Sequence, residues 1–277
     1  MRLGGPVSPA ERTPESWLAA LEAKRYRAAY CPLAVEAGRE ERVEYRAAAR
    51  EADVVIAEVG AWSNPLSLDQ ATADEAFGRI VASLRLADDV GARCCVNIAG
   101  SRGEKWDGPD PRDLTDETFD AIVALVRRIL DEVDPQSASY TLEPMPWMYP
   151  DSAESYARLV AAVDHPRFGV HYDPVNIVNS PAKYFATGRE ISDFVSRLGP
   201  RIVSVHAKDI ILRDGLTTHL DECIPGDGGL DYGVLLGELD RLDPDLPVMT
   251  EHLQGEEAYD RAAAYIREVA ARVGVGL

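Results

Sequence analysis

Strand-like and helix-like segments alternate eight times along this chain of 277 residues. The strand-like runs are short and rich in β-branched or aromatic residues, whereas the segments between them are amphipathic and of helical length. Strands are predicted at residues 2–7, 26–32, 54–61, 92–99, 139–144, 168–173, 202–207 and 247–252. Helices are predicted at residues 14–24, 40–51, 68–89, 115–133, 151–163, 190–198, 232–242 and 256–273. This order predicts a parallel sheet covered by helices.

Eight such units without a linker predict an α/β fold, a single (β/α)8 TIM barrel in which residues 1–277 form one domain. With 46% hydrophobic residues, the chain can bury a core of that size. A doubly wound open sheet is the alternative. The number of units and the lack of a G-x-G-x-x-G motif disfavour it.

The charge balance narrows the range of partners. Asp and Glu number 47 against 29 Lys and Arg, which gives a formal charge of −18. Nucleic acids and anionic membrane surfaces require a positive patch, so neither is an expected partner. The chain has no signal-peptide pattern, no apolar run long enough for a membrane span, and four cysteines without a C-x-x-C pair. We therefore expect a cytoplasmic protein with free thiols.

Four predicted strands lead into side chains that bind metals. These residues are Glu143, Asp173, His206 and Glu251. The carboxyl ends of the strands in a barrel share one face, so the four side chains are expected to converge there. Three carboxylates and one imidazole form a site for one divalent ion; Mn²⁺ is expected first, and Mg²⁺, Co²⁺, Zn²⁺ and Fe²⁺ remain open. The absence of a thiolate disfavours a structural zinc site.

The two glutamates of this set suggest a reaction. Glu143 and Glu251 would enter from the fifth and eighth predicted strands, on opposite sides of the cation. One carboxylate could then remove a proton next to a carbonyl while the other returns a proton. The cation would polarise that carbonyl. The pattern favours catalysis by proton transfer, with Glu143 and Glu251 as the catalytic pair.

Residues near the four strand ends are candidates for substrate contacts. Lys208 could hold a substrate oxygen or phosphate, with a surface salt bridge as the alternative. Asn176 could bind a sugar hydroxyl or cap its own loop. His171 has the same strand parity as Asp173, so it is either a partner one layer deeper or a satisfied core histidine.

Loop residues complete the candidate site. Trp62, Trp106 and Trp147 follow predicted strands, where their rings could stack on a sugar or simply pack. Residues 208–231 form a long predicted loop in which His219 and Glu222 could line the site or remain exposed. Asp231 is the predicted N-cap of the following helix.

Five short stretches carry a resemblance to a known family. They are Thr-Leu-Glu-Pro at 141–144, His-Tyr-Asp-Pro-Val-Asn at 171–176, Val-His-Ala-Lys-Asp at 205–209, Pro-Gly-Asp-Gly-Gly-Leu-Asp-Tyr at 225–232 and Thr-Glu-His-Leu at 250–253. The chain resembles the xylose isomerase-like TIM-barrel superfamily, in its sugar phosphate isomerase/epimerase branch. The resemblance implies a metal held by the four strand-end residues and the two glutamates as acid/base pair. It also implies a carbohydrate or polyol-derived substrate, and a homo-oligomer is a further possibility.

Alternatives remain within and outside this superfamily. Its ketose 3-epimerases usually carry a histidine where this chain has Asn176. Relatives with the same metal site include lyases, namely inosose dehydratases and C-glycoside-cleaving enzymes, which also begin by removing a proton next to a carbonyl. A nuclease resembling endonuclease IV would need more histidines than the five present, none of which precedes His165. A non-catalytic subunit is the remaining alternative.

Overall fold

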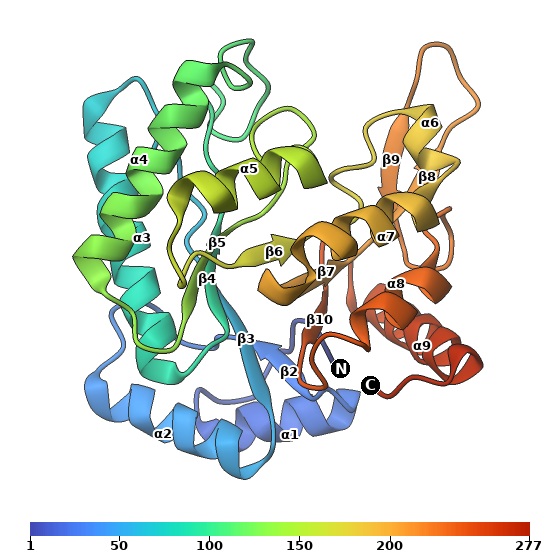
Figure 1. Ribbon diagram of the computed structural model, residues 1–277. Helices are drawn as coiled ribbons and strands as arrows, with labels where there is room; N and C mark the ends of the chain where they lie inside the picture. The colour runs from blue at the N-terminus through green and yellow to red at the C-terminus, as the bar shows by residue number, and fades with distance from the viewer.

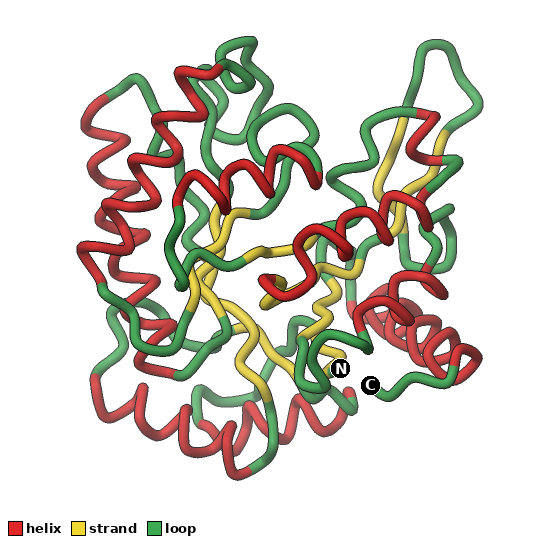
Figure 2. The backbone as a smooth tube through the Cα atoms, in the orientation of Figure 1, coloured by secondary structure: helices red, strands yellow, loops and turns green.

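Eight parallel strands form a nearly closed barrel in a computed structural model that describes residues 1–277 (Figure 1, Figure 2). Their order around the barrel is β5-β4-β3-β2-β1-β10-β7-β6. A bridge between Tyr140 and Phe168 brings the two end strands together. The strands are β1 (Arg2–Gly4), β2 (Ala28–Tyr30), β3 (Val55–Gly60), β4 (Cys94–Asn97), β5 (Ser139–Leu142), β6 (Val170–Tyr172), β7 (Ile202–Ala207) and β10 (Pro247–Thr250).

One long helix follows each barrel strand and packs on the outside of the sheet (Figure 1). These helices are α1 (Pro14–Lys24), α2 (Arg39–Glu51), α3 (Gln70–Val90), α4 (Asp116–Val133), α5 (Ala153–Val163), α7 (Thr187–Leu198), α8 (Tyr232–Leu239) and α9 (Glu256–Val273). The predicted single (β/α)8 barrel is therefore confirmed. A short α6 (Pro181–Tyr184) and a 3₁₀ turn, η1 (Gly199–Arg201), are additions that the sequence pattern did not predict. None of the helices is long and apolar enough to span a membrane.

Capping side chains set the starts of several helices. Thr13, Asp69, Thr115 and Ser152 each accept a hydrogen bond from a backbone N–H in the first turn of the helix that follows. Asp231 accepts one from Val234, so the predicted N-cap is confirmed. Most strands are shorter than predicted because the residues at their ends leave the ladder and enter the loops.

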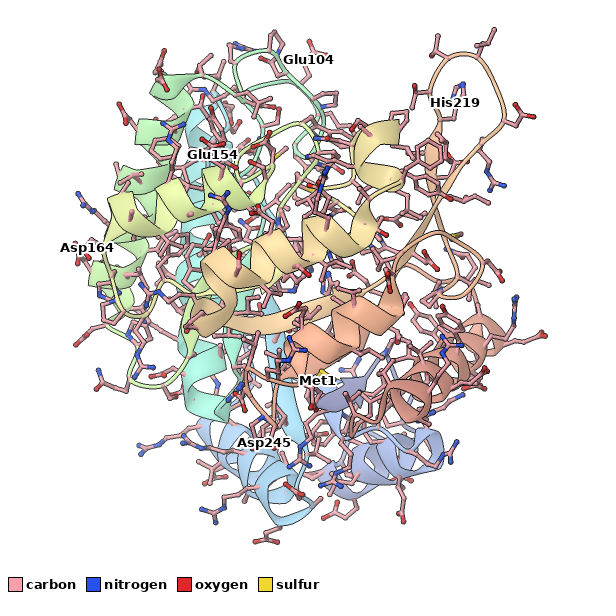
Figure 3. The ribbon with its side chains drawn as sticks, turned by 45° about the vertical axis from the view of Figure 1, so that its right-hand side comes forward. Met1, Glu104, Glu154, Asp164, His219 and Asp245 are labelled. Atoms are coloured by element: carbon pink, nitrogen blue, oxygen red, sulfur yellow. The ribbon has the colours of Figure 1, made fainter.

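The segment after β7 contains an antiparallel hairpin where a loop was predicted. Its strands are β8 (Asp209–Leu212) and β9 (Leu220–Cys223), which pair from Asp209–Cys223 to Leu212–Leu220. The hairpin projects away from the barrel, and His219 lies at its exposed tip (Figure 3). Of the two alternatives considered for His219, the structure agrees with the exposed one, since this side chain does not line the cavity at the barrel mouth, whereas β9 places Glu222 there.

Candidate metal centre

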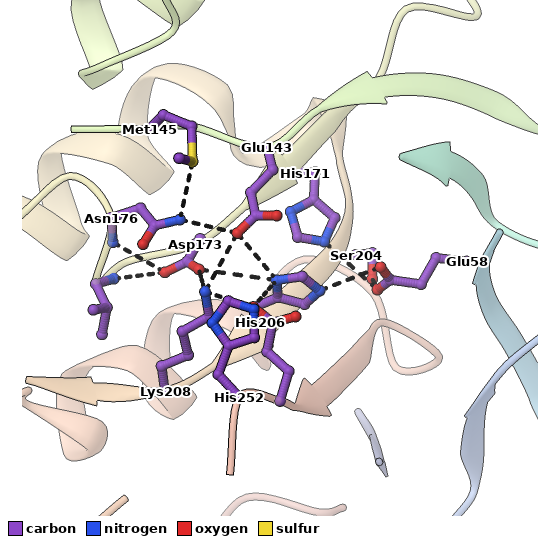
Figure 4. A network of polar contacts seen from close by, with 12 residues as sticks. Glu58, Glu143, Met145, His171, Asp173, Asn176, Ser204, His206, Lys208 and His252 are labelled. Carbon is purple, nitrogen blue, oxygen red and sulfur yellow. Dashed lines mark hydrogen bonds and ion pairs between the residues drawn. The ribbon is translucent and has the colours of Figure 1, made fainter. Parts of the chain in front are cut away.

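Strand β7 sends three alternate side chains into the barrel. Ser204, His206 and Lys208 share one face of the extended chain because successive side chains alternate. All three are buried. Figure 4 shows the His206 ring between Glu58 on one side and the strand-end carboxylates on the other. These three side chains therefore form a row that runs from the barrel interior to its mouth.

The four expected metal-type residues come together at the carboxyl ends of the strands. Glu143 follows β5, Asp173 follows β6, His206 lies in β7, and Glu251 follows β10. These strands are neighbours around the barrel. One donor atom of each residue lies within 4.8 Å of the donor atoms of the other three. His206 Nδ1, for example, lies 2.8 Å from Glu251 Oε1 and 3.4 Å from Glu143 Oε1.

The buried atoms of this cluster test whether it fits a cation. Asp173 Oδ2, His206 Nδ1 and Glu251 Oε1 make no hydrogen bond of ordinary geometry, although buried polar atoms nearly always make one, and both carboxylate oxygens lie close to a positive charge, the ammonium of Lys208. The other oxygen of Asp173 accepts the backbone N–H groups of Val175 at 2.8 Å and Asn176 at 3.1 Å. Three oxygen ligands and one imidazole suit a divalent cation. The residues therefore fit such an ion.

Lys208 lies among the same carboxylates. Its Nζ is 2.5 Å from Glu251 Oε1, 2.8 Å from Asp173 Oδ2 and 3.4 Å from Glu143 Oε1. Its side chain is 2% exposed, so this is a buried ion-pair cluster and the surface salt bridge considered from the sequence is wrong. Burial alone would lower the pKa of Lys208, but the carboxylates outweigh burial and raise the pKa well above its usual value.

The cations of the cluster keep its carboxylates ionised. Burial alone would raise the pKa of Glu251, yet the charges of His206 and Lys208 lower it to about 2. The pKa of Asp173 is also lowered against burial, chiefly by Lys208. Burial disfavours a charged His206, but Glu251, Glu58 and Glu143 raise its pKa well above the usual value. A histidine that binds a metal does so as the neutral imidazole. Cation binding would therefore release a proton from His206.

Glu58 is a buried acidic residue of β3 that the sequence interpretation missed. Its carboxylate accepts a hydrogen bond from Ser204 Oγ at 2.8 Å and contacts His206 Nε2 at 3.2 Å. A carboxylate on one imidazole nitrogen orients the ring so that the other nitrogen faces a metal. The available signal was a single carboxylate within the apolar run 54–59, because acidic side chains are almost never fully buried without partners.

His171 lies below the cavity. Its side chain is fully buried, its Nε2 is 3.5 Å from Glu58 Oε1, and its ring centroid is 4.1 Å from that of His206. It does not line the cavity above the cluster. A substrate contact of His171 therefore finds no support in this position. Of the two roles considered from the sequence, a partner one layer deeper and a satisfied core histidine, the contact with Glu58 suits the first.

A cavity of about 1120 Å³ opens above the cluster. Glu143, Lys208 and Glu251 line its charged end, together with Asn176, whose Nδ2 donates to Glu143 Oε1 at 2.9 Å. Glu222 lines it from β9 and contacts His252 Nδ1 at 3.1 Å. The rest of the wall includes Trp62, Trp106 and Trp147. Apart from His171 and His219, each candidate substrate contact named from the sequence lines this cavity.

The glycine-rich stretch at 225–232 supports the end of β7. Asp209, which follows Lys208, accepts the backbone N–H groups of Gly226 at 2.9 Å, Gly228 at 3.2 Å and Leu230 at 2.9 Å. A Cβ on Gly228 would lie 2.4 Å from Asp209 Oδ1, so this close approach requires glycine. Tyr232 also donates to the Lys208 carbonyl at 2.8 Å. The motif thereby fixes the strand end that presents Lys208.

Comparisons with known proteins agree with this architecture. A family model described as xylose isomerase-like TIM barrel matches residues 22–269. No curated protein matches the chain. Similar solved structures include a xylose isomerase-like TIM-barrel protein from Mycobacterium smegmatis in complex with magnesium, with 14% identity, 98% of this chain and 97% of that chain covered, and a TM-score of 0.68.

Sugar epimerases are among the similar structures. D-psicose 3-epimerase from Clostridium cellulolyticum H10, solved with D-tagatose, has 15% identity, 100% of both chains covered and a TM-score of 0.69. The 3-keto-D-glucoside 4-epimerase from E. coli has 13% identity, with 97% of this chain and 99% of that chain covered and a TM-score of 0.65. At these identities the likeness concerns the fold.

Proposed function

The chain belongs to the xylose isomerase-like TIM-barrel family, and on that premise we propose that it is a divalent-metal-dependent isomerase or epimerase of a sugar or a sugar-like keto compound. The observation that carries the proposal is the strand-end cluster, in which donor atoms of three carboxylates and one imidazole lie within 4.8 Å of one another beside a large cavity. Several structural neighbours are sugar epimerases, which agrees with this choice.

The two glutamates are the proposed acid/base pair. Glu143 follows β5 and Glu251 follows β10, with β6 and β7 between these strands, so the carboxylates approach a bound substrate from two sides. The low pKa of Glu251 keeps it ionised at neutral pH and able to accept a proton. One carboxylate takes the proton from the carbon next to the carbonyl, and the other returns a proton to that carbon or its neighbour.

Glu143, Asp173, His206 and Glu251 would hold the cation. When bound, the cation supplies electrophilic polarisation of the substrate carbonyl. We propose Mn²⁺, with Mg²⁺, Co²⁺, Zn²⁺ and Fe²⁺ as the other candidates, since the donor set accepts them all. Lys208 Nζ lines the cavity as a buried ammonium and can donate a hydrogen bond to a substrate oxygen.

A lyase on the same scaffold would begin with the same proton removal. No contact in this structure favours elimination, and several similar enzymes of known structure are sugar epimerases. We therefore retain isomerisation or epimerisation as the proposal.

Incubation of the Mn²⁺-loaded protein with keto sugars in D₂O tests this function. We expect deuterium at the carbon next to the carbonyl, detected by proton NMR, and no conversion of the sugar with the Glu143→Gln or Glu251→Gln variant. Conversion of a sugar with no incorporation of deuterium would point to hydride transfer instead. If the metal-loaded protein neither labels nor converts any of the keto sugars supplied, that result would contradict the proposal.

A further inference from the structure

Three tryptophans from three successive loops line the same cavity. Trp62 follows β3, Trp106 follows β4 and Trp147 follows β5. Trp62 is 42% exposed and Trp106 is 41% exposed. Large apolar rings left in water are costly unless a ligand covers them, so this wall has the character of a binding surface.

The loop that carries Trp62 is held in place. Asn97 is fully buried at the end of β4, where its Oδ1 accepts the Ser63 N–H at 3.1 Å and its Nδ2 donates to the Ser63 carbonyl at 3.2 Å. Gly60 leaves space for the indole, because a Cβ there would lie 2.5 Å from Trp62 Nε1. The ring is thus presented by a pre-formed wall, and such walls lower the entropic cost of binding.

The Trp106 loop is organised by a second buried side chain. Asp113 is fully buried and accepts hydrogen bonds from Ser101 Oγ at 2.8 Å, from the Arg102 N–H at 2.7 Å and from the Asp110 N–H at 3.0 Å. The Trp106 carbonyl accepts the Ser101 N–H at 3.0 Å, which closes the loop.

Trp147 is joined to the same loop. Its Nε1 donates to the Asp107 carbonyl at 2.8 Å. The indole nitrogen is thereby satisfied by protein, so the remaining ring surface offers apolar contact. Two of the three loops that carry the tryptophans are thus tied directly to each other.

The cavity has no free cation for a phosphate. Two lysines, Lys105 and Lys208, and the imidazole of His252 line it against four carboxylates, and His252 Nδ1 pairs with Glu222 at 3.1 Å. Lys105 Nζ pairs with Asp107 at 3.1 Å, and Lys208 is surrounded by carboxylates. The nearby arginines are also engaged outside the cavity, Arg102 with Glu117 and Arg213 with Asp221. A substrate with a negative group would meet repulsion here unless that group lay on the cation.

The size of the cavity exceeds what a single sugar ring fills. Its volume of about 1120 Å³ lies slightly above the roughly 300–1,000 Å³ typical of pockets for drug-sized ligands, whereas a free hexose has only about a dozen non-hydrogen atoms. Eleven of the 23 lining residues are hydrophobic. We infer that the substrate is an uncharged keto sugar that carries a bulky apolar substituent, such as an aromatic aglycone. This inference rests on the proposed function, because the carbonyl must reach the strand-end cluster.

Three substrates separate this inference from its alternatives. They are 4-nitrophenyl 3-keto-β-D-glucopyranoside, free 3-keto-D-glucose and D-fructose 6-phosphate, each incubated with Mn²⁺-loaded protein in D₂O. We expect kcat/KM for deuterium exchange to be highest for the aryl glycoside, by about tenfold or more over the free sugar. Equal or better exchange of the free sugar or the phosphate would overturn the inference and leave the proposed function standing.

Variants of Trp106 locate the effect. Trp106→Ala should lower kcat/KM for the aryl glycoside by about tenfold more than for the free sugar, mainly through KM, and Trp106→Phe should recover most of the loss. Phe185→Ala is the control, because Phe185 is 77% exposed and does not line the cavity. An equal loss for both sugars in Trp106→Ala would overturn the aromatic subsite.

A binding measurement tests the inference if none of the three substrates exchanges deuterium. The lack of exchange would contradict the proposed function for these sugars. Calorimetry then compares the affinity of the cavity for 4-nitrophenyl β-D-glucopyranoside with its affinity for D-glucose. Tighter binding of the aryl glucoside by about tenfold or more, lost in Trp106→Ala, would support the inference. Equal binding of the two would overturn it.

Discussion

The two sides of the barrel mouth carry different kinds of side chains. On the side of β5, β6, β7 and β10, charged side chains at strand ends form a buried cluster that includes Asp173, His206 and Lys208. On the side of β3 and β4, loops present the half-exposed rings of Trp62 and Trp106. We call these the charged side and the aromatic side.

The difference separates two tasks. Strand ends are held by the sheet on both sides, so they fix donor atoms to the tolerance that catalysis and metal binding need. Loops vary more readily, and here buried Asn97 and Asp113 hold them by hydrogen bonds to their backbone. Changes on the charged side should therefore affect turnover and metal binding, whereas changes on the aromatic side should affect which substrate is used.

The largest effect is expected from the proposed acid/base pair. Glu143→Gln or Glu251→Gln should lower turnover of any accepted substrate by about 10²–10⁴-fold, because the amide cannot take up a proton. Circular dichroism should show an unchanged fold. Glu257→Gln, an exposed change in the first turn of α9, serves as the control. A variant that retains nearly full turnover would remove that residue from the pair.

Removal of the buried ammonium comes next. Lys208→Met leaves carboxylates such as Asp173 and Glu251 without their counter-charge, so the free energy of unfolding without metal should fall by about 3–5 kcal/mol. Mn²⁺ should restore part of that loss. Urea unfolding with and without Mn²⁺ measures both effects, and Lys24→Met, which breaks a surface pair with Asp260, should cost at most about 1 kcal/mol. Equal losses in the two variants would contradict the cluster.

Glu58→Gln should weaken metal binding without abolishing it. The neutral amide orients His206 less firmly, and loss of such a partner typically lowers metal affinity by about 10–100-fold. Calorimetric titration with Mn²⁺ measures the affinity, and turnover should recover at saturating metal. An unchanged affinity would show that Glu58 serves only to fill the barrel interior.

On the aromatic side, Asn97→Ala should act on selectivity. Both hydrogen bonds to Ser63 would be lost, which should lower the free energy of unfolding by about 1–3 kcal/mol. The freed Trp62 loop should raise KM for an aryl glycoside more than for a free sugar. An equal change in KM for both substrates would contradict the assignment of substrate selectivity to the aromatic side.

The smallest effect is expected at Asp88, outside both sides. Its carboxylate accepts the backbone N–H groups of Gln136, Ser137 and Ala138 ahead of β5. Burial would raise its pKa, but these bonds lower it. A lowered folded-state pKa contributes stability that is present above the unfolded value of about 3.9 and is lost as pH falls through the folded value.

Urea unfolding of Asp88→Asn against the unchanged protein tests this contribution. At pH 6 the variant should be less stable by less than about 1 kcal/mol, since the carboxylate is partly exposed to solvent and its interactions are screened. The difference should shrink at pH 3. An equal difference at both pH values would assign the effect to packing instead of charge.

Local patterns were sufficient to predict the barrel and the positions of the four metal-type residues. The eightfold alternation is a periodic signal, and the strand-end residues follow their own strands directly, so both can be read within short windows. Convergence then follows from parallel strands. The hairpin was not predicted because its two strands are short. Each strand is stabilised by its pairing with the other within residues 209–223, which the sequence of one strand alone does not indicate.

Glu58 and Lys208 show where the sequence was insufficient. The partners of Glu58 are Ser204 and His206, which are 146 and 148 residues away, and only the closed barrel brings them together. The burial of Lys208 likewise depends on carboxylates from three other strand ends. Such contacts depend on which side chains face each other across the interior, which one strand's pattern does not specify.

Metal content is the most direct test of the central claim, which is that the strand-end cluster binds a divalent cation. Mass spectrometry of the purified protein, before and after incubation with Mn²⁺ and removal of the excess, gives the ions bound per chain. We predict about one divalent ion per chain, lost in His206→Ala and retained in His165→Ala, whose histidine is not part of the cluster. Absence of metal after incubation, or equal content in both variants, would contradict the account.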